Sequence, residues 1–212
     1  MQARLPRIWI ITKPEHAEGP VTPLVRALEG CPAGAVGVQL RAHGADDREL
    51  VAWGRALRAA TSRAGCPLTV NRRPDVAEIL GADGVHLPES GLSVRELRST
   101  WPDIQLVGAS RHDRSGLLRA AEEQATFAFL SPVYAVPGKA EPMGVEGFAA
   151  QIAGVEIPTY ALGGVGVADV APLIAAGAKG IAVRRAIYDA LDPKAALHEL
   201  LRELDKTSPK GE

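Results

Sequence analysis

The side chains best suited to chemistry in this sequence stand together at residues 107–112, where a short apolar run ends in Ser110, Arg111 and His112. Histidine changes its charge near neutral pH, so it can accept and donate protons under physiological conditions. We therefore predict His112 as the catalytic residue, a general base and acid. Ser110 is predicted to contact the substrate, and it either orients His112 or bonds to its own backbone.

Two further segments have the composition of a phosphate site. Gly163 and Gly164 end one apolar run, and Arg184 and Arg185 follow another and begin the last helix. Glycines let a ligand approach the backbone, a helix start presents free N–H groups, and arginine adds bidentate donors. These four residues are predicted to bind phosphate, although a tight turn with solvated arginines is the alternative.

Polar side chains also end several other apolar runs. Gln39 and Arg41 follow one run, Asn71 ends another, and Lys139 comes shortly after a third. All four carry hydrogen-bond donors and are predicted to bind substrate. Salt bridges or loop clamps at the rim are the alternative for each of them.

These residues need a scaffold that gathers the ends of apolar runs. The eight runs, each bounded by Gly, Pro or polar residues, are 7–12, 35–40, 67–71, 83–87, 104–109, 126–131, 157–163 and 179–183. Amphipathic segments separate them, with helix-capping signals at Asp46 or Asp47, at Ser93 with Glu96, and at Asp192. Eight strand and helix alternations predict an α/β fold, a single-domain (β/α)8 TIM barrel, whose chemistry lies at the C-terminal strand ends.

Composition fits one such domain, predicted at residues 1–205, with a flexible tail at 206–212. The chain has 212 residues, 46% of them hydrophobic, and 24 basic against 25 acidic residues. This balance gives no reason to expect nucleic acid or an anionic membrane as partner. No apolar run reaches the ~18 residues of a membrane span, and Cys31 and Cys66 lack metal-binding spacing, so we expect a cytoplasmic protein with reduced thiols.

The motifs in order resemble the thiamine phosphate synthase/TenI superfamily over about the whole chain. They are Asn-Arg-Arg-Pro-Asp at 71–75, Ala-Asp-Gly-Val-His-Leu-Pro at 82–88, Gly-Ala-Ser-Arg-His at 108–112, Pro-Val-Tyr at 132–134, Ala-Leu-Gly-Gly at 161–164 and Gly-Ile-Ala-Val at 180–183. Several spaced motifs in order are far more specific than any one of them.

The two branches of this superfamily imply different reactions. The synthase branch joins a pyrimidine methyl diphosphate to a thiazole phosphate with Mg²⁺ held by carboxylates, but here Arg72 replaces the first Asp and only Glu89 stands near the second. The TenI branch keeps the strand-five histidine without those carboxylates. The resemblance therefore implies a thiazole tautomerase, an isomerase that uses no metal or other cofactor and takes a small phosphorylated thiazole as its ligand.

Two alternatives stay open. One is a thiamine phosphate synthase, a transferase in which Glu89 and Asp75 recruit Mg²⁺ in an altered geometry. The other is a non-catalytic regulator that binds a thiazole or thiamine phosphate. A homodimer also stays open, because the sequence does not fix the oligomeric state.

Overall fold

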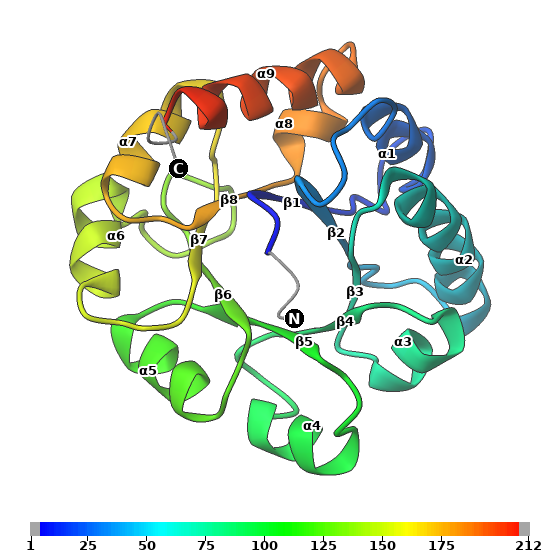
Figure 1. The fold of residues 1–212 in the computed structure, drawn as a ribbon, viewed down its shortest axis with the longest axis horizontal. Coiled ribbons are helices and arrows are strands. Elements are labelled where there is room, and N and C mark those ends of the chain that lie inside the picture. Colours follow the sequence, from blue (N-terminus) through cyan, green and yellow to red (C-terminus); the bar gives the residue numbers. More distant parts are fainter. Residues whose placement is uncertain (1–4, 208–212) are drawn as a thin grey trace.

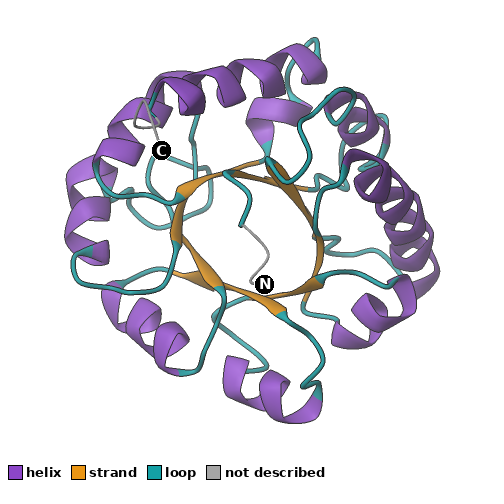
Figure 2. Cartoon of the chain, in the orientation of Figure 1, coloured by secondary structure: helices purple, strands orange, loops and turns teal. Residues whose placement is uncertain are grey.

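Eight parallel strands form a closed barrel at the centre of the molecule. The computed structural model describes residues 5–207, in which β1 to β8 follow one another around the ring in chain order and β8 pairs with β1. Helices surround the ring of strands, as Figures 1 and 2 show. The predicted (β/α)8 barrel is confirmed.

Each observed strand begins inside one of the eight predicted apolar runs. The strands are β1 (Ile8–Ile11), β2 (Val36–Leu40), β3 (Leu68–Asn71), β4 (Gly84–Leu87), β5 (Leu106–Arg111), β6 (Phe127–Leu130), β7 (Thr159–Leu162) and β8 (Gly180–Val183). Only β5 exceeds its predicted end, because pairing with β6 continues to Arg111 opposite Leu130. Ser110 therefore belongs to the strand itself.

Three of the helices begin at the caps that the sequence predicts. The helices are α1 (Thr22–Ala27), α2 (Asp47–Ala64), α3 (Pro74–Leu80), α4 (Val94–Thr100), α5 (Arg114–Glu122), α6 (Gly144–Ile152), α7 (Val170–Ala175) after the 3₁₀ turn η1 (Val167–Asp169), α8 (Arg185–Tyr188) and α9 (Pro193–Lys206). Asp46 and Ser93 cap α2 and α4 with complete capping boxes, and Asp192 caps α9. Helix α9 includes Lys206, the first residue of the predicted tail, and residues 208–212 lie outside the described residues.

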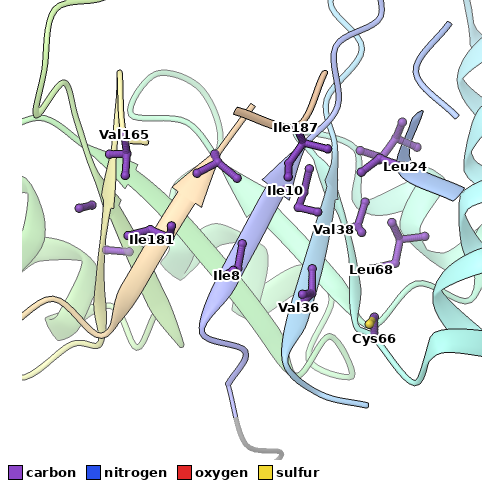
Figure 3. Packing of buried hydrophobic residues seen from close by; sticks show 14 of the residues in the cluster. Ile8, Ile10, Leu24, Val36, Val38, Cys66, Leu68, Val165, Ile181 and Ile187 are labelled. Atoms are coloured by element: carbon purple, nitrogen blue, oxygen red, sulfur yellow. The ribbon is translucent and has the colours of Figure 1, made fainter. Parts of the chain in front are cut away.

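One hydrophobic layer lies between the strands and the helices. Residues that alternate along the strands, such as Ile8 and Ile10 of β1, point outward into this layer and meet helix residues such as Leu24 and Ile187 (Figure 3). Alternation places their neighbours inside the barrel. The outer layer thus attaches the helices and fixes the positions of the loops that follow the strands.

A second, smaller cluster of aromatic rings fills the barrel interior. The rings of Trp9 and Phe127 stack with centroids 4.6 Å apart, and Phe129 and Tyr160 pack edge-on against Trp9. A Cβ atom at position 37 would lie 2.6 Å from the Trp9 ring, so Gly37 provides the space that the indole occupies. We call Trp9, Phe127, Phe129 and Tyr160 the aromatic plug.

No helix within residues 5–207 combines the length and the hydrophobicity needed to cross a membrane.

Candidate functional site

A cavity of about 810 Å³ opens at the C-terminal ends of the strands. Ile11, Leu162 and Ala182 line it and also pack against the aromatic plug, which therefore forms its floor. All ten residues that the sequence predicts for the site line this cavity, namely Gln39, Arg41, Asn71, Ser110, His112, Lys139, Gly163, Gly164, Arg184 and Arg185. The structure brings them together, and their individual roles stay predictions.

His112 lies just beyond the end of β5 with its imidazole half exposed to the cavity. Its Nδ1 lies 2.7 Å from the carbonyl oxygen of Ser131, which can only accept, so Nδ1 carries the hydrogen. In the neutral ring, Nε2 is then an acceptor. The nearest carboxylate, Glu89, lies 3.8 Å from Nε2, beyond hydrogen-bond range, so Nε2 remains available to a ligand.

Ser110 does neither of the two things that the sequence suggested. Its Oγ lies 2.8 Å from Nε2 of His86, on the neighbouring strand β4, rather than bonding to His112 or to its own backbone. The period of two along β5 explains this arrangement, because Ser110 points into the barrel, where His86 also lies. Ser110 still lines the cavity and can contact a ligand.

His86 is completely buried inside the barrel. Its ring stacks on Phe129 with centroids 4.4 Å apart, and its Nδ1 has no hydrogen-bond partner among the described residues. Burial, followed by the nearby charges of Arg111 and Arg41, lowers the pKa of His86 to about 3. His86 is therefore neutral at physiological pH and forms part of the core.

Arg111 points away from the cavity. Its Nε donates to the carbonyl of Gly116 in α5 at 3.2 Å, and its Nη1 donates to the carbonyl of Ser110 at 2.7 Å. Only 7% of the residue is exposed. It therefore joins β5 to α5 and holds the strand end that carries Ser110.

Three predicted substrate-binding residues lie on or directly after β2 and β3. Gln39 Nε2 donates to Asn71 Oδ1 at 3.3 Å, so these amides orient each other at the cavity floor. Arg41 is fixed through its backbone, since its N–H and C=O both bond to the hydroxyl of Thr12 at 2.8 and 2.7 Å. The Arg41 guanidinium remains available to the cavity.

The glycines after β7 have a packing role that is visible in their surroundings. Gly163 and Gly164 have φ of +103° and +70°. A Cβ at Gly164 would lie 2.7 Å from Cβ of Tyr134, and one at Gly163 would lie 2.9 Å from Cα of Pro132. The tight turn that the sequence offered as the alternative is therefore present. Both glycines also line the cavity wall.

Arg184 and Arg185 lie at the start of α8, as its N-cap and its first residue. Helix α8 has four residues, and α9 is the last helix, so the prediction that these arginines begin the last helix is wrong. After Leu191, Asp192 caps a separate helix, α9, and Pro193 is its first residue. Arg184 lies 3.6 Å from Glu15 and, like Arg185, lines the cavity.

Positive charge dominates the cavity wall. Arg41, Arg72, Lys139, Arg184 and Arg185 line it, against two carboxylates. Burial and the charges of Arg184 and Arg72 lower the pKa of Arg41. Burial and the charges of Arg41, Arg72 and Lys139 likewise lower the pKa of His43. Such a field favours anionic ligands.

The carboxylates do not form a magnesium site. Those that line the cavity are Glu89 and Asp189, and Asp189 lies 2.5 Å from Nζ of Lys13. Asp75 is bound by Arg73 at 2.7 Å and is not part of the cavity wall. Within residues 5–207, no three His, Cys, Asp or Glu side chains gather to hold a metal ion. Mg²⁺ is usually held by one or two carboxylates together with substrate phosphates. Among the described residues, the one wall carboxylate without a lysine partner is Glu89, which lies 3.6 Å from Arg119, so these side chains fit Mg²⁺ poorly.

Sequence reasoning missed several members of the site. His43 lines the cavity from the loop after β2, and the Ser131 carbonyl holds His112. The position of His43 two residues after Arg41, past a strand end, was a usable signal. A backbone carbonyl carries no signal in the sequence.

Known proteins with one name are similar to this chain over nearly its whole length. A family model described as thiamine monophosphate synthase matches residues 8–187. A protein named putative thiamine-phosphate synthase from Geobacter sulfurreducens is 38% identical over 92% of each chain, and the thiamine-phosphate synthase of Thermus thermophilus is 35% identical over 94% of this chain and 98% of its own. The structure of thiamine phosphate pyrophosphorylase from Pyrococcus furiosus has 28% identity and a TM-score of 0.87, covering 98% of both chains.

These relatives overturn the predicted thiazole tautomerase. They match nearly the whole chain and bear the name of the synthase, the reaction that the sequence prediction placed second. The prediction took the loss of carboxylates at Arg72 and Glu89 as a loss of the transferase reaction. A cavity wall rich in cations offers another means of binding phosphate groups.

Proposed function

Since this chain belongs to the thiamine monophosphate synthase family, we propose that it is a transferase that joins a pyrimidine methyl diphosphate to a thiazole phosphate. In this reaction the lone pair of the thiazole nitrogen forms a bond to the methylene carbon of the pyrimidine. The bond from that carbon to the diphosphate oxygen breaks, and its electron pair leaves with pyrophosphate. The products are thiamine phosphate and pyrophosphate.

The observation that carries this proposal is the distribution of cations around the cavity. Arg72 follows β3, whereas Gly163 and Gly164 follow β7, four positions away in a ring of eight strands and hence across the barrel. Arg184 and Arg185 lie next to the glycines, after β8. Two anion-binding regions on opposite sides suit two phosphorylated substrates with their reacting atoms between them.

The thiazole phosphate is assigned to the glycine side. Consecutive residues with positive φ, as at Gly163 and Gly164, direct backbone N–H groups toward a common concavity that favours anions. Arg184, directly after β8, adds a guanidinium to this side of the cavity. These groups support binding of one phosphate near β7 and β8.

The pyrimidine ring is assigned to the middle of the cavity. Nε2 of His112 accepts a hydrogen bond there, and the amino group of an aminopyrimidine is a suitable donor. Gln39 and Asn71 present amides from β2 and β3 to the same cavity. Lys139, after β6, adds a cation near the reacting centre.

The proposal is tested by incubating the purified protein with both substrates and quantifying thiamine phosphate by chromatography together with released pyrophosphate. We expect the two products in equal amounts, both with added Mg²⁺ and with EDTA. Arg184→Gln is expected to raise the KM for the thiazole phosphate, and the exposed Arg48→Gln in α2 serves as the matched control. Binding of both substrates without any product under either condition would contradict the proposal and identify a regulator instead.

A further inference from the structure

Arg72 is the residue in this cavity whose presence most needs an explanation. It follows β3, at the position where the resemblance gives the synthase branch a metal-binding Asp, and it lines the cavity. Its backbone N–H donates to the carbonyl of His86 at 3.0 Å, and its Nη2 lies 3.3 Å from the hydroxyl of Ser90. The guanidinium is thus present at the mouth but only weakly engaged.

The backbone at Arg72 is held in a conformation that side chains disfavour. Its φ is +67°, a left-handed conformation that glycine adopts freely and that other residues adopt at a cost. Such outliers persist where the surrounding structure holds them, and they cluster at ligand sites. The conformation therefore directs attention to what the guanidinium contacts when a ligand is bound.

The electrostatic surroundings leave this guanidinium without a negative partner. Across residues 5–207, none of Arg72, Arg41 and Lys139 forms an ion pair with a carboxylate, whereas the wall carboxylates Asp189 and Glu89 lie 2.5 Å from Lys13 and 3.6 Å from Arg119. The charges of Arg72 and Arg41 both depress the pKa of His43 in the β2 loop. Unpaired cations of this kind are stabilised when an anion enters.

A diphosphate matches this group of cations in charge and shape. Its oxygens accept the paired N–H groups of guanidinium in bidentate geometry, which lysine alone does not provide. The thiazole phosphate already has a separate region across the barrel, near Gly164 and Arg184. The Arg72 side therefore remains for the diphosphate of the second substrate.

We propose that Arg72, together with Arg41 and Lys139, binds the diphosphate group directly and takes the place of a divalent cation. This inference rests on the proposed function, because it assigns one of that reaction's two substrates. When the carbon–oxygen bond breaks, the electron pair stays on the leaving pyrophosphate, and the guanidinium groups neutralise the added charge. The step needs no further reactant.

The experiment measures binding of inorganic pyrophosphate to the full chain by calorimetry in the presence of EDTA. Wild-type protein is expected to bind without metal, and Arg72→Gly is expected to bind about tenfold more weakly or worse, since a charged hydrogen-bonded contact is lost. Glycine adopts the φ of +67° freely, so this variant is expected to fold. Arg72→Lys keeps the charge but lacks the paired N–H donors of guanidinium, so its affinity is expected to lie between those of wild type and Arg72→Gly. Arg48→Gln is expected to bind as wild type.

Two results would overturn the inference. One is pyrophosphate binding that appears only after Mg²⁺ is added, and the other is unchanged binding by Arg72→Gly. Turnover separates this inference from the proposed function. Product formation that EDTA abolishes refutes metal-free binding but keeps the transferase, whereas Arg72-dependent pyrophosphate binding without any product refutes the transferase but keeps the site.

Discussion

The hydroxyl of Ser110 and the Nε2 atom of His86 lie 2.8 Å apart across β5 and β4. Because Nδ1 of His86 has no partner among the described residues, we place the ring hydrogen on Nε2, which leaves only a lone pair at Nδ1. Ser110 then accepts from His86. Its own hydrogen is free to be donated into the cavity, which makes Ser110 a donor toward the substrate.

His86 predicts a pH dependence of stability. Burial holds its pKa at about 3, against about 6.5 in the unfolded chain, so between these values the unfolded state binds more protons. Stability from this site is complete above pH 6.5 and falls as the pH falls toward 3. From pH 7 to 5, the wild type should lose about 2 kcal/mol more than His86→Gln in urea unfolding. Parallel pH curves for the two proteins would contradict this assignment.

His43 should report on the cations around it. Burial and the charges of Arg41, Arg72 and Lys139 lower its pKa, so removing one charge should raise it. We expect a higher His43 pKa in Arg72→Gly than in wild type when the ring protons are titrated by NMR. Pyrophosphate binding to wild type should raise it too. An unchanged titration in both experiments would show that the anion binds elsewhere.

Gly164 and Gly138 form a matched pair for testing the glycine turn. Their φ values are +70° and +73°, but an added Cβ meets Tyr134 at 2.7 Å only at Gly164, while nothing lies within 4 Å at Gly138. Alanine at either position costs about 1 kcal/mol of backbone strain. Gly164→Ala should lose a further ~1–3 kcal/mol in urea unfolding and raise the KM for the thiazole phosphate. Equal losses would mean that the turn yields to the added methyl group.

Substitution of His112 should lower the rate of the reaction without changing the affinity for pyrophosphate. Removing its acceptor in His112→Ala should lower kcat/KM about tenfold or more, which corresponds to one lost hydrogen bond of ~1.4 kcal/mol. Pyrophosphate affinity should stay at the wild-type value, because Arg72 and Arg41 belong to other loops. Steady-state assays and calorimetry on the same preparation measure both. An undiminished kcat/KM would remove His112 from the reaction.

The scaffold could be predicted because each of its signals is local. The apolar runs bounded by Gly and Pro mark all eight strands, and Asp46, Ser93 and Asp192 cap the helices that they precede in sequence. Short-range hydrogen bonds and side-chain period determine these features. The residues of the cavity wall followed directly, since parallel strands bring their C-terminal ends together.

Relationships between strands were beyond the sequence. The pairing of Ser110 with His86 depends on which side chains of β4 and β5 meet inside the barrel, and the anchor of His112 is a backbone carbonyl. The reaction was predicted wrongly, because the exchange of a metal-binding carboxylate for Arg72 was taken as loss of the transferase. The similarity to synthases over nearly the whole chain overturned that prediction.

The aromatic plug has a kinetic consequence. Because Trp9, Phe127, Phe129 and Tyr160 fill the barrel below the cavity, both substrates and both products pass through a single opening. The thiamine phosphate and the pyrophosphate must therefore leave by the path along which the substrates arrived. A closed floor thereby makes product release a condition for the next pair of substrates to enter, although no moving part of the protein enforces it.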